Sequence, residues 1–243
     1  MNKAEPVDFS RRVQPEDLPE LMDGPCSYEE FRACLVDLEK VNRWSMGYRP
    51  TLAWLDEVAG SFAGSGETLR IVDVGSGGGD MLRRVAEWAR QRGVKVELVG
   101  VDLNPYAARA AKELSHRDDG IRWVKGDAFS LEPERVDVVI SSLLTHHLAE
   151  VEVVRFVRWM ESTARRGWFV NDLCREPVPY YAFGVLASVM RWHRFVRHDG
   201  PVSFRRSFRE EDWSRMLLAA RVAESDVTLR RWRPGRLCVG RVK

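Results

Sequence analysis

The chain has 243 residues, a length that allows one large domain with its own hydrophobic core, or a core domain with a small appendage. Hydrophobic residues make up 44% of the chain and charged residues 30%, which is typical of globular rather than disordered proteins. The 38 basic and 36 acidic side chains give a net charge of +2, and this balance argues against a dedicated nucleic-acid binder. Arginines do cluster at 205–206 and 230–233, where we expect a solvated face.

The sequence shows no signature of export or of membrane insertion. Its first thirty residues are polar and contain prolines, and no uncharged apolar run reaches the roughly 18 residues of a membrane span. The scattered cysteines Cys26, Cys34, Cys174 and Cys238 form no C-x-x-C pair, which predicts free thiols in a cytoplasmic protein. They give no support for a zinc site, and we expect no metal.

The first part of the chain, residues 1–65, differs from the rest. A polar start is followed by a predicted helix over 28–44, in which Phe31, Leu35 and Leu38 recur with helical spacing. We expect this segment to form a helical lid that precedes a core domain over 66–243.

Strand-like and helix-like segments alternate from Leu69 onward. Short apolar runs predict buried strands over 69–73, 96–101, 121–124, 136–141 and 167–173. Helices are predicted between them over 81–92, 105–114 and 151–160, the second with Pro105 in its first turn and its continuation over 107–114. Strands separated by helices form βαβ units, so the chain is predicted to have an α/β fold with a parallel sheet and helices on both faces.

The end of the chain has a different pattern. A helix is predicted over 209–221, followed by strands over 226–232 and 236–242 that flank Pro234-Gly235. Two strands joined by such a turn form an antiparallel hairpin. Residues 174–208 are an insertion between the fifth strand and this last helix.

A glycine loop follows the first core strand and precedes the first core helix. Gly75, Gly77 and Gly79 alternate along it, and Asp73 precedes them. Glycine lets a backbone turn approach a nucleotide cofactor where a Cβ would strike the ligand. A dinucleotide-binding turn has the spacing G-x-G-x-x-G, whereas this loop has D-x-G-x-G-x-G.

That spacing resembles motif I of the class I (Rossmann-like) S-adenosylmethionine-dependent methyltransferases. The resemblance implies that Gly75, Ser76 and Gly77 contact S-adenosylmethionine, which becomes S-adenosylhomocysteine. This cofactor has no pyrophosphate but carries an ammonium and a sulfonium group, and the Asp73 carboxylate suits such cations.

Two further acids follow the next two strands. Asp102 lies 23 residues after Gly79, close to the distance at which an acid meets ribose hydroxyls. Its alternative role is the N-cap of the following helix, but Asn104 can take that place. Asp127, with Ala128, resembles the family's adenine-contacting loop, and Leu103 is expected to flank the ring. Taken alone, Asp127 would be an ordinary turn residue.

The fourth strand leads into the sequence SSLLTHHL at 141–148. It resembles the LHHL stretch of many small-molecule methyltransferases, including the ubiquinone and menaquinone type. The resemblance implies that Ser142, or its neighbour Ser141, lies against the methionine part of the cofactor. His147 is predicted to face the active site, although a histidine at such a place can also be a cap or packing residue.

The insertion contains fourteen uncharged residues, 177–190, among them Tyr180, Tyr181 and Phe183. These are expected to form an aromatic cap that encloses an apolar substrate, the alternative being an ordinary buried helix. Just beyond it, His198 oriented by Asp199 is a second candidate base, unless residues 199–201 simply form a turn.

The lid contributes one more candidate. Arg43, with Arg49 as second choice, is expected to bind the methionine carboxylate through a bidentate contact.

The resemblance extends from about Leu69 to Lys243 and implies a seven-stranded sheet with an antiparallel last strand. It favours O-methylation of a phenolic or quinone-like small aromatic metabolite by a monomer or homodimer, with C-methylation as the alternative. The D/N-P-P-Y and proline–cysteine motifs of several nucleic-acid and protein methyltransferases are absent. A nucleic-acid or protein methyltransferase and a non-catalytic S-adenosylmethionine-binding protein remain the other classes.

Overall fold

The structure is a computed structural model that describes residues 7–62, 64–116, 119–131 and 135–243. Residues 1–6 and 63 of the expected lid lie outside this range. No helix in the described ranges is long and apolar enough to cross a membrane.

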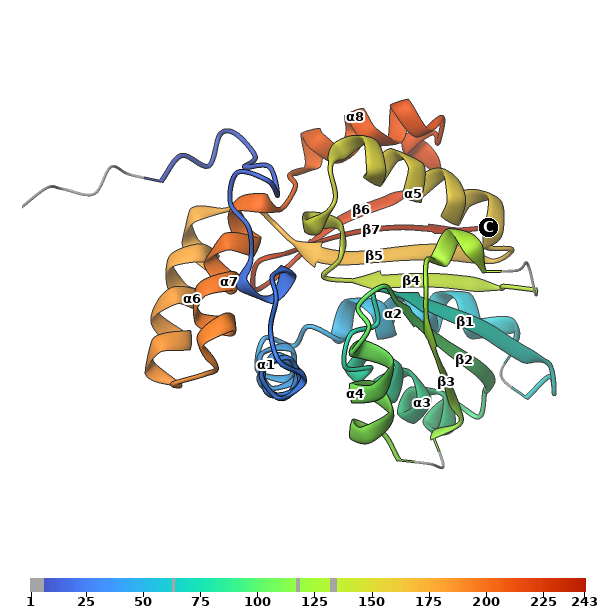
Figure 1. The fold of residues 1–243 in the computed structure, drawn as a ribbon. Helices are drawn as coiled ribbons and strands as arrows, with labels where there is room; N and C mark the ends of the chain where they lie inside the picture. Colours follow the sequence, from blue (N-terminus) through green and yellow to red (C-terminus); the bar gives the residue numbers. More distant parts are fainter. Residues whose placement is uncertain (1–6, 63, 117–118, 132–134) are drawn as a thin grey trace, which may run out of the picture.

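The centre of the molecule is one seven-stranded sheet with the order β3-β2-β1-β4-β5-β7-β6 (Figure 1). Its strands are β1 (Thr68–Val74), β2 (Lys95–Asp102), β3 (Ile121–Lys125), β4 (Val138–Ser142), β5 (Gly167–Leu173), β6 (Thr228–Trp232) and β7 (Arg236–Val242). The first five are parallel to one another, and β7 runs antiparallel to both β5 and β6. The predicted α/β fold, the parallel core and the closing hairpin are confirmed.

Helices cover both faces of the sheet. One face packs against α2 (Arg49–Val58) and α3 (Asp80–Arg92), and the other against α5 (Glu150–Thr163) and α8 (Glu210–Ala220). The short helix α4 (Ala107–Leu114) connects β2 to β3. The separate helix α2 was not predicted from the sequence.

Three further helices gather at the edge toward which β4 and β5 point, α1 (Tyr28–Trp44), α6 (Pro177–Val189) and α7 (Arg194–Arg206) (Figure 1). Helix α1 has the predicted bounds and begins with a capping box between Ser27 and Glu30. The insertion 174–208 is therefore two helices that pack against each other, and α7 also packs against α1.

Residues 199–201 lie inside α7, so the alternative interpretation of these residues as a turn is wrong. Pro201 is tolerated in the helix at its eighth position, and Gly200 lets the ring of Phe183 on α6 come close. A Cβ on Gly200 would lie 1.9 Å from that ring. The motif therefore serves helix packing rather than chain reversal.

The sheet register places the predicted acids at one edge. Val74 pairs with both Val101 on β2 and Ser141 on β4, so the loops after these strands are neighbours. Asp102 pairs with Lys125 at the end of β3, next to the loop that carries Asp127. In an open parallel sheet, ligands bind at this carboxyl edge.

Candidate active site

Two cavities lie at the carboxyl edge of the sheet. The larger, about 940 Å³, is walled by the loops after β1, β2 and β3, and we call it the loop cavity. The smaller, about 280 Å³, lies among α1, α6, α7 and the loop after β4, and its walls are largely apolar; we call it the apolar cavity. Both are lined by Met22, Leu143 and His147, so the two cavities meet there.

The glycines of the loop after β1 have two different functions. Gly75 and Gly77 line the loop cavity with φ values of +74° and +49°. Gly79 also has a positive φ, +74°, but a Cβ at this position would lie 2.2 Å from the ring of Trp123. The first two glycines thus shape the cavity, whereas the third makes room for a side chain of β3. Ser76 is buried and is not part of the cavity wall.

Asp102 is held in a fixed orientation in the wall of the loop cavity. Its Oδ2 accepts a hydrogen bond from the Gly77 amide at 2.8 Å, and its Oδ1 accepts one from the Asn104 amide at 2.8 Å. Burial raises the pKa of Asp102, while these two backbone donors oppose the shift. Asn104 in turn accepts from the Tyr106 amide at 2.9 Å, next to the start of α4, which leaves Asp102 free of a capping role.

Asp73 is the most deeply buried acid of the loop. Its Oδ1 has no hydrogen-bond partner among the described residues. Burial, reinforced by the nearby charges of Asp80 and Asp102, raises the pKa of Asp73 well above its usual range. A buried carboxylate oxygen without a donor is rare in folded proteins, and an ammonium group nearby would satisfy it.

The predicted adenine-binding residues also lie in the loop cavity. Asp127, Ala128 and Leu103 all line it, and Leu103 is 70% exposed in its rim. The Asp127 Oδ1 accepts from the Phe129 amide at 3.0 Å, and Phe129 lines the cavity beside it. An apolar rim next to a carboxylate is suited to a flat ring that carries an amino group.

Besides Asp73 and Ser76, two more predicted cofactor contacts lie outside both cavity walls. Arg43 is exposed on α1, and Ser142 is partly buried at the end of β4, but neither lines a cavity. The neighbouring Ser141 donates a hydrogen bond to the Val74 carbonyl at 2.9 Å and so joins β4 to β1.

The paired histidines lie in a short 3-10 helix (η5, Thr145–His147) directly after β4. His146 is buried, with its Nδ1 2.7 Å from Asp172 Oδ1. Burial alone would raise the pKa of Asp172, but the charge of His146 and the hydrogen bonds of His146 and Thr145 hold it well below its usual value. His147 lines both cavities, and its Nδ1 lies 3.2 Å from Asp23 Oδ1.

Glu20 lies next to the two histidines and was not predicted from the sequence. We call Glu20, His146 and His147 the polar corner of the apolar cavity. The carboxylate is buried, 3.6 Å from His146 Nε2 and 3.7 Å from His147 Nε2, and it accepts a hydrogen bond from Ser203 Oγ at 2.8 Å. Burial raises the pKa of Glu20, against the opposing charges of His147 and Arg206. No local sequence pattern indicates Glu20, because more than a hundred residues separate it from the histidines.

His198 and Asp199 are in contact, as predicted, with His198 Nδ1 2.7 Å from Asp199 Oδ1. The His198 side chain is 46% exposed and lines neither cavity, whereas Asp199 lines the apolar cavity. Asp199 also accepts hydrogen bonds from the amides of Leu21, at 2.8 Å, and Met22, at 3.1 Å. It therefore anchors the segment that carries Glu20.

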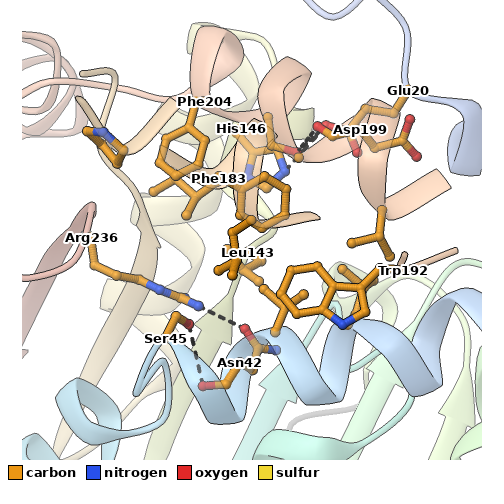
Figure 2. A pocket seen from close by; sticks show the side chains of 18 of the residues that line it. Glu20, Asn42, Ser45, Leu143, His146, Phe183, Trp192, Asp199, Phe204 and Arg236 are labelled. Atoms are coloured by element: carbon orange, nitrogen blue, oxygen red, sulfur yellow. Dashed lines mark hydrogen bonds and ion pairs between the residues drawn. The ribbon is translucent and has the colours of Figure 1, made fainter. Parts of the chain in front are cut away.

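The predicted aromatic cap is divided between two surfaces. Phe183 lines the apolar cavity, together with Trp192 and Phe204, which sequence reasoning did not single out (Figure 2). Tyr180 and Tyr181 do not line it and instead pack against Phe9, with ring centroids 5.2 and 6.4 Å away.

A second polar group lines the apolar cavity at a distance from the histidines. Figure 2 shows Arg236, Asn42 and Ser45 on one side and Glu20 with Asp199 on the other. The Arg236 guanidinium is buried and donates hydrogen bonds to Asn171 Oδ1 at 3.1 Å and Asn42 Oδ1 at 2.8 Å. Burial lowers the pKa of Arg236.

Comparison with known proteins agrees with this geometry. A family model described as a methyltransferase domain matches residues 71–167, which include the glycine loop, all three acids and the histidine pair. No curated protein matches the sequence. The chain therefore contains a methyltransferase domain over residues 71–167. The sheet order, with its antiparallel β7, is that of the predicted class.

Solved structures share the fold at low sequence identity. The plantazolicin methyltransferase BamL, in complex with a triazolic desmethylPZN analog and SAH, is 13% identical, with 85% of this chain and 88% of that chain covered and a TM-score of 0.61. Human N-acetylserotonin methyltransferase with SAM is 18% identical, with 89% and 56% covered and a TM-score of 0.59. Magnesium protoporphyrin IX methyltransferase (ChlM) from Synechocystis PCC 6803 with SAH is 16% identical, with 91% and 89% covered and a TM-score of 0.53.

The loop cavity fits S-adenosylmethionine. Its glycine turn leaves the backbone open, and Asp102 is fixed with its carboxylate in the wall. The buried Asp73, with an oxygen that has no partner among the described residues, lies behind the wall, directly before Val74 and Gly75. A pyrophosphate would meet the two acids of the wall, Asp102 and Asp127, whereas the cationic methionine end of S-adenosylmethionine complements this acidic surrounding.

Proposed function

We propose that this methyltransferase transfers the methyl group of S-adenosylmethionine to a small, largely apolar acceptor, and that it methylates the oxygen of a phenolic hydroxyl. The observation that carries the proposal is the junction of the two cavities at Leu143 and His147. A cofactor in the loop cavity can present its methyl group at this junction to an acceptor in the apolar cavity.

Each part of the cofactor has a complementary place in the loop cavity. We assign the ribose hydroxyls to Asp102 and the adenine to Asp127, Ala128 and Leu103. Gly75 and Gly77 let the backbone approach the cofactor. The ammonium group is assigned to the neighbourhood of Asp73.

The acceptor is assigned to the apolar cavity because of its wall chemistry. Aromatic and aliphatic side chains from α1, α6 and α7 make up most of it, among them Phe183, Trp192 and Phe204. Burial of an aromatic body against such walls is favourable, at about 25 cal/mol for each Å² of apolar surface removed from water. The solved neighbours are named for acceptors that are small molecules, which supports this choice of substrate class.

The polar corner at Glu20, His146 and His147 is the place for the reacting hydroxyl. In the transfer, the acceptor O–H bond breaks, its proton passes to bulk water, and its oxygen forms the new bond to the methyl carbon. The C–S bond breaks with its electron pair left on sulfur, which yields S-adenosylhomocysteine. Much of the acceleration in such a displacement comes from alignment of the two reactants.

The test has two steps. Calorimetry with S-adenosylhomocysteine should show one binding site per chain, and incubation with radiolabelled S-adenosylmethionine should then label members of a panel of phenols and quinones. Absence of cofactor binding contradicts the whole proposal. Acceptors with blocked hydroxyls provide the control. If these are still labelled, and the label lies on a ring carbon, the reaction is C-methylation and not O-methylation.

A further inference from the structure

We propose that Glu20, His146 and His147 form a binding site for a divalent transition-metal ion, with an open coordination position that faces the apolar cavity. The three side chains come from two distant segments, the one before α1 and the one after β4. All three line the apolar cavity, so an ion held between them would be accessible to the acceptor.

The distances between the three side chains suit a shared ion better than direct hydrogen bonds. Glu20 Oε1 lies 3.6 Å from His146 Nε2, and Glu20 Oε2 lies 3.7 Å from His147 Nε2. Both separations exceed a normal hydrogen bond. One ligand atom from each of the three residues lies within 4.8 Å of the others. Metal–ligand bonds of about 2.0–2.2 Å place neighbouring ligand atoms some 3–3.5 Å apart, so a small inward movement completes the site.

The tautomer of His146 is set for metal binding. A carboxylate can only accept, so the His146 Nδ1 that lies 2.7 Å from Asp172 carries the proton. The Nε2 atom of His146 is then left with a free lone pair on the side of Glu20. His147 Nδ1 lies between an acceptor, Asp23 Oδ1 at 3.2 Å, and a donor, Arg206 Nη2 at 3.4 Å, so metal binding through Nε2 requires the tautomer that donates to Asp23. Metal-binding histidines characteristically donate their other ring proton to a carboxylate in this way.

The charge of the corner also favours a cation. The carboxylates of Glu20, Asp23 and Asp172 surround the two imidazoles, whereas one guanidinium, that of Arg206, contacts Glu20 at 3.5 Å and Asp23 at 3.2 Å. A second guanidinium, that of Arg12, donates to backbone carbonyls including that of His146. Three carboxylates exceed the two charges that Arg206 and Arg12 supply. A bound divalent ion would take the place of the imidazolium charges that otherwise oppose the carboxylates, and the imidazoles would then be neutral.

Two histidines and one carboxylate with an open position form a donor set suited to Zn²⁺ and neighbouring divalent ions. This role rests on the proposed function, because the open position would bind the acceptor oxygen. The ion would lower the pKa of that hydroxyl, whose proton passes to bulk water, and would hold the oxygen in line with the methyl group. No change of oxidation state is involved.

The direct test measures metal binding without reference to activity. The full chain is stripped with a chelator, dialysed, and titrated with Zn²⁺ in a calorimeter. We expect one ion per chain, with affinity at least about tenfold lower in Glu20→Gln and in His146→Gln. The matched control is His116→Asn, which removes an exposed histidine beyond α4 and should bind Zn²⁺ like the original chain. Equal affinity in all of these proteins overturns the proposal.

A second measurement identifies the ligands. Co²⁺ substituted for Zn²⁺ should give visible ligand-field bands that vanish in Glu20→Gln. An intense sulfur-to-cobalt charge-transfer band would assign the ion to the cysteines and overturn the proposal. Asp172→Asn, which alters only the residue behind His146, should weaken Zn²⁺ binding about 10–100-fold. S-adenosylhomocysteine binding by each variant shows that its fold is intact.

Failure of this proposal can be distinguished from failure of the proposed function. Methyl transfer at full rate by chelator-stripped protein overturns the role of the ion and leaves the methyltransferase assignment intact. Stoichiometric Zn²⁺ binding that depends on Glu20 and His146, without transfer to any phenol or quinone, supports the metal site and contradicts the assigned acceptor class.

Discussion

The loop cavity and the apolar cavity are built in opposite ways. The loop cavity is built around three neighbouring strand ends, where hydrogen bonds hold Asp102 and Asp127 in place, and the segment 22–26, α1 and α5 complete its wall. The apolar cavity is made of side chains from segments that lie far apart in the sequence, and its polar corner joins residue 20 to residues 146 and 147. Local sequence motifs mark the strand ends of the first cavity, whereas the polar corner of the second depends on contacts between segments that are distant in the sequence.

The largest effect expected from a single substitution is at the junction of the two cavities. In His147→Asn, we expect the methyl-transfer rate to fall about 100-fold, the scale of a group that manages a proton or an ion at the reacting atom. Affinity for S-adenosylhomocysteine should change only a few-fold, since the loop cavity keeps its other contacts. Single-turnover kinetics measures the methyl-transfer rate, and calorimetry measures the affinity for S-adenosylhomocysteine. An equal loss of rate in His198→Asn would contradict the assignment of the junction.

The loop cavity should respond to the loss of Asp102. In Asp102→Ala, the Gly77 and Asn104 amides lose their acceptor and the ribose loses its partner. The amides lose their acceptor in both the free and the bound protein, so that cost falls on stability, whereas the ribose hydroxyls lose theirs only in the complex. The lost ribose contact should cost about 1–3 kcal/mol, so affinity for S-adenosylhomocysteine should fall about tenfold or more. Calorimetry measures this directly. Unchanged affinity would remove Asp102 from the ribose site.

Substitution of two glycines in the loop after β1 should affect different properties of the protein. Gly79→Ala places a Cβ 2.2 Å from Trp123 in a left-handed conformation, and we expect a loss of about 1–3 kcal/mol in unfolding free energy. Gly77→Ala meets no atom closer than 3.6 Å, so it should lose less stability but more cofactor affinity. Denaturant unfolding and calorimetry on both variants test this. The reverse order would show that Gly79, not Gly77, contacts the cofactor.

The wall of the apolar cavity should control the acceptor KM. Phe183→Ala removes an aromatic wall and should raise KM several-fold, while affinity for S-adenosylhomocysteine stays the same. The matched control is Tyr181→Ala on the same helix, because Tyr181 is 54% exposed and lines neither cavity. Steady-state kinetics with one identified acceptor compares them. Equal effects on KM would place the acceptor elsewhere.

The smallest expected effect is a proton released on cofactor binding. Burial raises the pKa of Asp73 in the free protein, and a bound ammonium would favour the charged carboxylate and lower that pKa again. Binding should therefore release up to about one proton, and affinity should rise with pH until the pH passes the pKa of the free protein. Calorimetry in buffers of different ionisation enthalpy counts the protons. Asp73→Asn should abolish the release, and release that persists would place the titrating group elsewhere.

The difference between the two cavities also explains what could be predicted from the sequence. Strand ends, glycine spacing and the acids at 73, 102 and 127 are local features, and the fold and the loop cavity followed from them. Helix α2 was missed because its sequence continues the lid without a clear break. Other features depend on how distant segments pack. Glu20 was missed because its partners, the two histidines, are far away in the sequence. Tyr180 and Tyr181 pack against Phe9 and not, as expected, against the substrate cavity.

The central claim is that cofactor and acceptor occupy adjoining cavities that meet at His147. A crystal structure of the chain with S-adenosylhomocysteine tests it most directly. The account predicts the ribose at Asp102, the adenine beside Asp127 and Leu103, and the sulfur at the junction, directed toward the apolar cavity. S-adenosylhomocysteine bound outside the loop cavity, or with its sulfur directed away from His147, would contradict the account.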